Sequence, residues 1–250
     1  MNCRITIQYD GSRYNGWQKQ GNTKNTIQGK LEDILTRMTG EPVEVHGAGR
    51  TDAGVHAIGQ TANFHLKGKW NPEEVREYLN RYLPEDIEVT ALGEVSPRFH
   101  SRLSAVEKVY AYRIGLDGRK SVFRRKYRYC CPGKLNVEAM KEGAGWCVGT
   151  HDFRSFCANR HMKKSTVRTI TDITFSEKEG DLIITYTGNG FLYHMVRILT
   201  GTLLEIGEGK RKPEEMKEIL EGKDRTLAGR TAPAQGLMLM EVRYGDEYEV

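Results

Sequence analysis

The sequence predicts an α+β protein made of two tandem βαββαβ units with largely antiparallel sheets. Residues 3–95 alternate between period-two apolar patterns, typical of strands, and period-3.6 patterns, typical of helices. The resulting order is strand, helix, strand, strand, helix, strand, and it recurs after residue 107 with longer connections. This ferredoxin-like and RRM-like arrangement predicts one domain over 1–106, a second over 107–250, and an active site in the cleft between them.

The first predicted unit begins with a strand and a helix. Apolar and polar side chains alternate over Cys3–Tyr9, which indicates a half-buried strand. The helix that follows has Asn25 as its expected cap, with Gln28 three residues later. Its buried stripe consists of apolar residues at helical spacing, namely Ile27, Leu31, Ile34, Leu35 and Met38.

Two strands, a second helix and a last strand complete this unit. Short strands are predicted around Val43–Val45 and over Ala62–Leu66. The second helix should begin after Asn71, because Pro72 suits the first helical position and two acids follow in the first turn. Ile87–Val95 then closes the unit as a strand.

The second predicted unit repeats this order, with one extra short helix that Pro213 opens ahead of the last strand. Its other elements are, in chain order, a strand over Tyr110–Leu116, a helix from Asn136, a hairpin of Ile170–Phe175 and Leu182–Tyr186, an apolar helix over 191–207 and a strand over Leu237–Tyr244.

Length and composition are those of an ordinary globular protein. The 250 residues are 38% hydrophobic and 28% charged, and no apolar run is long enough to cross a bilayer. The chain starts directly on a strand pattern without a secretory or transit leader, so we expect a cytoplasmic protein and no membrane partner. Five cysteines without metal-ligand spacing indicate reduced, buried thiols.

Basic charge is concentrated in the second half. Residues 1–106 carry 13 basic and 13 acidic side chains, whereas residues 107–250 carry 25 and 20. Lys108–Arg128 interleaves basic with aromatic residues and has one acid, and the basic Arg154–Arg168 has none. Either stretch by itself fits a solvated face equally well. Two such stretches favour a polyanionic partner, since cations displace condensed counterions and rings stack on bases.

The stretch HGAGRTDAGVHAIGQ over 46–60 holds one arginine and one acid among four glycines. It is not a P-loop, because no Gly-Lys-Ser/Thr follows, and Asp52 stands where a dinucleotide fingerprint needs its third glycine. His46 and His56 could join Asp52 as metal ligands, but their spacing in a glycine-rich turn fixes no common face. We therefore predict no metal site.

Asp52 beside Arg50 is the candidate for chemistry. Glycines at 47, 49 and 54 let the backbone approach a ligand closely, and Arg50 can hold a phosphate or fill the gap left by an extruded base. An isolated aspartate fits a nucleophile or a proton shuttle. From the residues alone, an aspartate that caps a turn or pairs with Arg50 is the simpler interpretation, and spacing cannot overturn it.

Six motifs follow one another along the chain: YDGSRYNGWQKQ from Tyr9, AGRTDAGVHAIGQTANFH from Ala48, RFHSRLSAVEKVYAYRI from Arg98, GTHDFRSF from Gly149, GNGFLYHMVRILTGTLLEIGEG from Gly188 and TAPAQGLML from Thr231. In this order they resemble the TruA family of tRNA pseudouridine synthases over nearly the whole chain. The resemblance implies a pseudouridine-synthase fold.

The resemblance also implies roles for six residues. Asp52 falls on the family's catalytic nucleophile and Arg50 on its active-site arginine. Tyr110 falls on the tyrosine that stacks under the target base, although by itself it would equally suit a sheet core. Arg197 matches a basic residue that pairs with the catalytic carboxylate, where the alternative is a helix arginine reaching solvent. The last two match apolar walls of the substrate pocket, Phe191 and Leu237.

The implied reaction needs a single acid and no cofactor. It breaks the N1–C1′ bond of a uridine, turns the uracil while it stays bound, and rejoins it through C5. A hydrolase would need a second carboxylate to activate water, and no candidate is evident beside Asp52. The sequence leaves both a covalent ester and a glycal route open.

The resemblance implies tRNA as the partner, with uridines 38 to 40 of the anticodon arm as usual targets, and a homodimer whose protomers share the seating of RNA. Two alternatives stay open: a paralogue that modifies ribosomal RNA or another tRNA position, and a catalytically idle RNA-binding protein, which would have no need of Asp52. Contacts with the RNA backbone are expected from five basic residues, Lys126, Arg128, Arg160, Lys163 and Lys164. No role is assigned to Gln60, His56, His65, His100, His151 and His161.

Overall fold

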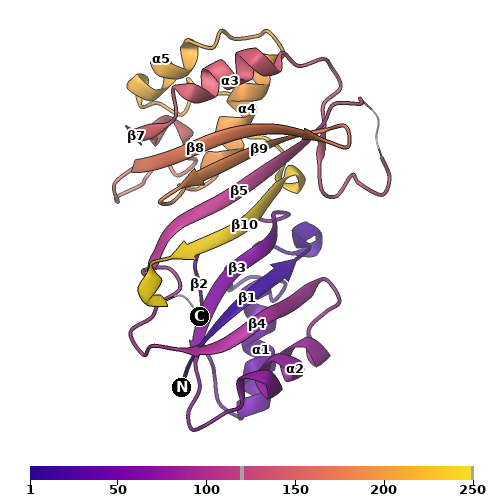
Figure 1. The fold of residues 1–250 in the computed structure, drawn as a ribbon, viewed down its shortest axis with the longest axis vertical. Coiled ribbons are helices and arrows are strands. Elements are labelled where there is room, and N and C mark those ends of the chain that lie inside the picture. The colour runs from indigo at the N-terminus through magenta and orange to yellow at the C-terminus, as the bar shows by residue number, and fades with distance from the viewer. Residues whose placement is uncertain (119–120, 249–250) are drawn as a thin grey trace. The chain divides into compact units, whose positions relative to one another are not determined.

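The computed structural model of the chain describes residues 1–118 and 121–248 (Figure 1). They fall into two compact units. Unit 1 consists of Met1–Lys108 together with the segment that starts at Met238, and unit 2 is Val109–Leu237. This partition differs from the predicted division after residue 106 chiefly in its last segment, which belongs to unit 1.

Unit 1 has the predicted βαββαβ order. Its elements are β1 (Asn2–Tyr9), α1 (Ile27–Thr39), β2 (Val45–Gly47), β3 (His56–His65), α2 (Pro72–Tyr82) and β4 (Ile87–Val95). Strand β1 lies between β4 and β3, antiparallel to both, and β2 pairs antiparallel with the end of β3. The prediction of a ferredoxin-like first unit is therefore confirmed.

Strand β10 (Leu237–Tyr244) adds a parallel neighbour to β3. Met238 pairs with His56 and Leu239 with Ala57, at the start of β3, whereas β2 pairs with residues 62–64 near its other end. The chain therefore completes this sheet only with its last strand. The sequence predicted that strand but not its partner.

The N-cap of helix α1 lies one residue later than predicted. The side chain of Thr26, not Asn25, accepts the hydrogen bond of Gly29 N at 3.2 Å. Asn25 instead donates its side-chain amide to Arg13 O, which ties down the preceding loop. The caps predicted for the other two helices are confirmed, since Asn71 Oδ1 accepts from Glu73 N and Asn136 Oδ1 from Ala139 N.

The glycine-rich stretch is shorter than its composition suggests. Strand β2 includes His46 and Gly47, and β3 already begins at His56, so only residues 48–55 form the connecting loop. Gly59 lies within β3 and packs so closely against β10 that an added Cβ would lie 2.4 Å from Met240 O. Glycine here marks a close approach of two strands and not a turn.

Unit 2 contains the remaining elements. They are β5 (Ala105–Gly115, whose first four residues belong to unit 1), β6 (Tyr129–Cys130), α3 (Val137–Gly145), β7 (Gly149–Asp152), β8 (Val167–Lys178), β9 (Asp181–Gly188), α4 (Met195–Gly207) and α5 (Glu215–Gly222). The strand order is β5-β9-β8-β7, with β6 beside β5. The β8–β9 and β7–β8 pairs are antiparallel, which confirms the predicted hairpin, and β5–β6 is parallel.

Helices α3, α4 and α5 gather on one face of the unit 2 sheet (Figure 1). Helix α4 is buried almost all round, as its apolar sequence predicts, but it begins at Met195 and not at 191. Single turns of 3-10 helix occur at Gly11–Arg13, Arg154–Phe156, Ala234–Gly236 and Asp246–Tyr248. Across the described residues, none of the helices combines the length and apolar character that a membrane span requires.

Candidate active site

The candidate aspartate lies on the 48–55 loop, which joins β2 to β3 in unit 1. Asp52 is half-buried and Arg50 is exposed. The loop turns back on itself after Asp52, because Val55 N donates to Asp52 O at 3.1 Å and Gly54 adopts a φ of 79°. A carboxylate at such a turn is accessible while its backbone is fixed.

Three hydrogen bonds from other segments hold this loop on both sides of Arg50. The buried Gln60 donates its side-chain amide to Gly49 O at 2.9 Å. The Tyr9 hydroxyl lies 2.7 Å from Thr51 Oγ1, and Trp17 N donates to Thr51 O at 3.0 Å. Burial raises the pKa of Tyr9, which keeps this hydroxyl neutral. These bonds restrict the backbone that carries Arg50 and Asp52.

The motif at residues 9–20 packs directly against the loop. An added Cβ at Gly11 would lie 1.9 Å from Val55 O, and one at Gly16 would lie 2.7 Å from Thr51 O. The buried Trp17 ring lies so close to Gly47 that a Cβ there would come within 2.5 Å of it. The glycines therefore let the backbone of residues 9–20 pack against the 48–55 loop and the strand before it, a contact that larger residues would block.

A second group of contacts fixes the two ends of the loop. At its far end the buried His56 accepts from Gly11 N at 3.1 Å, and its Nδ1 is 3.2 Å from Asp10 Oδ1. At its near end Lys108 Nζ donates to Ala48 O at 2.7 Å. His56 and Gln60 thus have structural partners that sequence spacing did not reveal.

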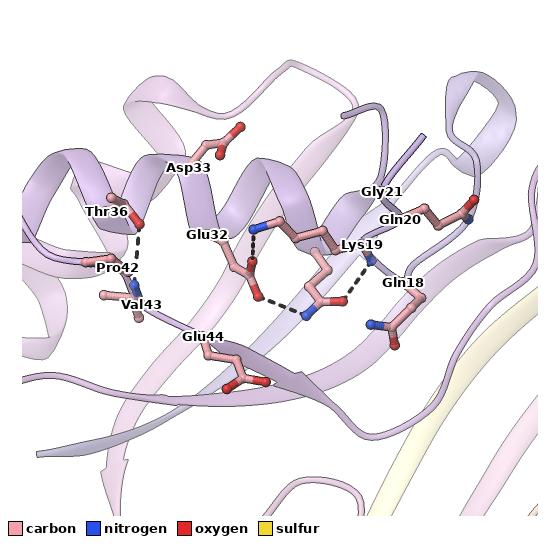
Figure 2. A pocket seen from close by; sticks show the side chains of 11 residues that line it. Gln18, Lys19, Gln20, Gly21, Glu32, Asp33, Thr36, Pro42, Val43 and Glu44 are labelled. Atoms are coloured by element: carbon pink, nitrogen blue, oxygen red, sulfur yellow. Dashed lines mark hydrogen bonds and ion pairs between the residues drawn. The ribbon is translucent and has the colours of Figure 1, made fainter. Parts of the chain in front are cut away.

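A groove of about 690 Å³ opens elsewhere on unit 1, between the 18–21 loop, α1 and residues 42–44 (Figure 2). Glu32 lines the groove. Its carboxylate pairs with Lys19 Nζ at 2.8 Å and accepts a hydrogen bond from Gln28 Nε2 at 2.8 Å. Asp33 and Glu44 add negative charge to the lining. None of the predicted site residues lines this groove, and its acidic lining does not suit a polyanion.

Tyr110 and Phe191, both in unit 2, lie together. Tyr110 is 7% exposed on β5, and its ring meets that of Phe191 edge-on, with centroids 5.2 Å apart and an interplanar angle of 83°. Phe191 precedes α4 and is half-buried. The two predicted substrate-binding aromatics are therefore in ring contact, with Tyr110 buried and Phe191 partly exposed.

Arg197 is held at the first turn of α4. Its Nε donates to Ala232 O at 2.8 Å, and Ala232 N returns a bond to Arg197 O at 2.9 Å. The side chain is half-buried. Leu237, the other predicted pocket wall, is buried at the start of β10. The pairing of Arg197 with Asp52 stays a prediction.

Four of the five predicted RNA-contacting cations are on the surface of unit 2, and one is not. Lys126, Arg160, Lys163 and Lys164 are exposed. Arg128 is 2% exposed and pairs with the equally buried Asp181 at 2.7 Å and with Asp117 at 3.1 Å. An arginine that is itself buried and paired with two carboxylates has no geometry for a phosphate, so that prediction is wrong. Arg119 and Lys120 of the same basic stretch lie outside the described residues.

Neither a metal cluster nor a disulfide appears in the described part of the chain. Residues 1–118 and 121–248 contain no group of three or more His, Cys, Asp or Glu side chains that could hold a metal ion. All five cysteines are free thiols. Cys147, for example, is buried, and burial raises its pKa to about 12, which keeps its sulfur protonated and unreactive.

Comparison with known proteins gives a consistent result. A family model described as tRNA pseudouridine synthase matches residues 5–102 and 146–245. The chain is 47% identical to tRNA pseudouridine synthase A of Bacillus sp. (strain KSM-64) and 45% identical to tRNA pseudouridine synthase A 1 of Clostridium tetani. Each alignment covers 97% of this chain and 99% of the relative.

The matched ranges include the loop that carries Arg50 and Asp52, as well as Phe191, Arg197 and Leu237. Tyr110 falls in the gap between the two ranges but within the span of the full-length relatives, which reaches nearly every residue. A match of this extent and identity shows that the chain belongs to the tRNA pseudouridine synthase family, a family of isomerases.

Proposed function

We propose that the chain converts uridine to pseudouridine in the anticodon stem-loop of tRNA, at positions 38 to 40, with Asp52 as the catalytic carboxylate. The observation that carries the proposal is the family match through the 48–55 loop, combined with the fixed and half-buried position of Asp52 on it. The names of the relatives supply the substrate class, tRNA.

The geometry of the loop suits this chemistry. A flipped nucleoside must bring its C1′ to the carboxylate, and a carboxylate on a mobile loop would seldom meet it in the correct orientation. The bonds from Gln60, Tyr9 and Trp17 limit that mobility. Arg50 is exposed beside Asp52 and can contact a phosphate or fill the space that the flipped base leaves.

In the proposed reaction the N1–C1′ bond breaks and its electron pair leaves with the uracil. Asp52 meets the electron-deficient sugar, either by forming an ester at C1′ or by assisting a glycal route. The bound uracil then turns, and C5 supplies the electron pair for the new bond to C1′. The proton on C5 is lost and N1 gains one, so the product is an isomer and no cofactor enters the balance.

Three unit 2 residues have proposed roles in these steps. Tyr110 and Phe191 offer an apolar surface against which the uracil ring can rest while it is detached. Arg197 would stabilise the ionised carboxylate of Asp52, since an opposite charge nearby favours the charged form. Its bond to Ala232 limits the directions in which the guanidinium can point.

Binding of the RNA is assigned to exposed cations of unit 2. Arg160, Lys163 and Lys164 follow one another on the connection between the Arg154–Phe156 turn and β8, all exposed. Lysine and arginine side chains that neutralise phosphates make binding fall steeply with salt. The homodimer that the resemblance implies and a location in the cytoplasm are also part of the proposal.

The test is to incubate the protein with unmodified total RNA and to map pseudouridine by carbodiimide adducts and reverse-transcription stops. We expect new stops at tRNA positions 38 to 40 with the wild type and none with Asp52→Ala. Stops in ribosomal RNA or at other tRNA positions would contradict the proposed target but support the proposed reaction. Unchanged stops with Asp52→Ala would refute the role of the carboxylate.

A further inference from the structure

Residues 121–128, which directly precede β6, are anchored by two arginines on one buried aspartate. Arg124 Nη2 lies 2.5 Å from Asp181 Oδ2, and Arg128 Nη1 lies 2.7 Å from Asp181 Oδ1. Asp181 is 1% exposed at the first position of β9. Breaking a buried ion pair strongly destabilises a protein, so the pairs of Arg124 and Arg128 with Asp181 fix both ends of residues 124–128.

Backbone contacts fix the residues between and before these anchors. Arg125 N donates to Ser121 O at 2.8 Å and Tyr127 N to Arg124 O at 2.9 Å, which folds 121–127 into successive turns. Arg124 Nη1 also donates to Glu179 O at 3.1 Å, in the β8–β9 turn. The segment therefore has a defined shape although it contains no regular helix or strand.

This fixed segment presents an aromatic ring to solvent. Phe123 is 92% exposed, the largest exposed fraction among the large hydrophobic side chains that the structure describes, and Val122 beside it is 64% exposed. Arg125 and Lys126, which follow the anchoring Arg124, are exposed cations. Residues 121–128 contain no acid. An exposed aromatic ring beside positive charge has the chemistry of a site that stacks on a base and contacts its phosphates.

We propose that the Phe123 tip, residues 121–127, binds single-stranded RNA by stacking Phe123 on an unpaired base while Arg125 and Lys126 contact the adjacent phosphates. Every base has a π-face, so a lone ring can stack without reading sequence, and flanking cations hold the backbone beside it. The proposal rests on the proposed function, which makes RNA the partner.

The charge of the tip favours RNA over a second copy of the chain. The chain carries a formal net charge of +5, and the two cations beside Phe123 would meet a protein that is itself basic. A polyanion gains from both cations, whereas an apolar contact between two copies would have to bury or displace them. A second copy at the tip is therefore the alternative that the experiment must separate.

The experiment measures the affinity of the full-length protein for an unmodified tRNA transcript by fluorescence anisotropy. It uses an Asp52→Ala background, so that the RNA is not turned over. Phe123→Ala and Phe123→Leu should weaken binding about 5- to 100-fold, whereas Phe123→Trp should bind within about twofold of the parent. Leu103→Ala removes another highly exposed apolar side chain and is the matched control, with unchanged affinity expected.

Salt dependence separates the two parts of the tip. Arg125→Gln and Lys126→Gln should each lower the slope of log Kd against log salt by about 0.7, and Phe123→Ala should leave the slope unchanged. Thermal melting of each variant should match the parent, because exposed side chains add little to the core.

Two results would overturn the proposal. Parental affinity with Phe123→Leu would show that the ring does not stack, and a changed oligomeric state by light scattering with unchanged RNA affinity would assign the tip to a second copy. Binding is measured independently of catalysis. If Asp52→Ala kept its activity in the mapping assay, the proposed chemistry would fail while the result for Phe123 would stand.

Discussion

Gln60 donates its side-chain amide to the carbonyl of Gly49 across a distance of 2.9 Å, from the middle of β3 to the loop that carries Arg50 and Asp52. The donor is completely buried. A residue with no assigned role in the sequence therefore holds the backbone immediately before the candidate active-site pair.

Gln60→Ala should lower kcat more than it weakens RNA binding, because it removes a support of the Asp52 loop and touches no RNA in our proposal. Misplacement of a catalytic group by about 1 Å costs on the order of 100-fold in rate, so we expect a loss of about 10- to 100-fold. Single-turnover rates and RNA affinity measured in parallel separate the two effects. Gln8→Ala, a glutamine of β1 whose amide bonds the Glu88 side chain, is the control and should retain the parental rate.

Arg197→Met should lower turnover by about 10- to 1000-fold with RNA affinity within a few-fold of the parent. Removing a charge that stabilises an ionised carboxylate affects the chemical step, and methionine keeps the apolar stem. The rate is measured by release of tritium from C5-labelled uridine in a tRNA transcript. Parental turnover in this variant would refute the pairing of Arg197 with Asp52.

Tyr110→Phe tests whether the hydroxyl of Tyr110 has a chemical role beyond packing. The ring contact with Phe191 survives this change, so RNA binding and folding should be preserved. If the hydroxyl moves the C5 proton late in the reaction, the variant should accumulate the rearranged nucleotide that still carries its C5 proton. Its tritium release should fall by about 100-fold or more. Parental release would leave Tyr110 with stacking alone.

Arg128→Met should lower the free energy of unfolding, because Arg128 pairs with a buried carboxylate. It leaves the buried Asp181 with one of its two guanidinium partners, and breaking a buried pair costs about 3–5 kcal/mol in free energy of unfolding. Urea denaturation gives this value. Replacing the surface cation Lys126 by Met should leave the unfolding free energy within about 0.5 kcal/mol of the parent.

Stability should fall in acid partly through Glu208. Burial by itself raises the pKa of this carboxylate, but the hydrogen bond from Lys210 Nζ and the charge of Arg230 outweigh it, and the net pKa is lowered. A lowered folded pKa contributes stability that is present above about pH 4.5 and is lost as the pH falls through the folded value.

Glu208→Gln should therefore be less stable than the parent at pH 7 and lose less further stability between pH 5 and pH 3. Unfolding free energies from urea titrations across this range give the comparison. Glu221→Gln is the matched control, because that carboxylate is exposed and pairs weakly with Lys217, at a distance of 3.9 Å. An equal acid slope for the parent and Glu208→Gln would contradict the assignment.

Local patterns predicted most of the elements, because strand alternation and helix caps are encoded over a few residues. The cap of α1 was misplaced by one residue since Asn25 and Thr26 both suit the position, and only the contact of Asn25 with Arg13 decides between them. The parallel pairing of β10 with β3 joins residues about 180 positions apart, which no local period can reveal.

The candidate site shows the same limit. The motif that holds Asp52 was visible in the sequence, but the hydrogen bonds that Tyr9, Trp17 and Gln60 make to its backbone and to Thr51 were found only in the structure. Arg128 was misassigned because a run of positive charge does not show that one member faces a carboxylate 53 residues later. Composition gives the sign of a surface, whereas burial decides which charges reach it.

The position of β10 has a consequence for biosynthesis. When the ribosome has released the first hundred residues, the start of β3 still lacks its parallel neighbour, because that neighbour is translated about 180 residues later. The nascent protein must carry an open sheet edge, with unpaired amide and carbonyl groups, until β10 has emerged. Truncated translation products should consequently be prone to aggregation and degradation even when every residue around Asp52 has been made.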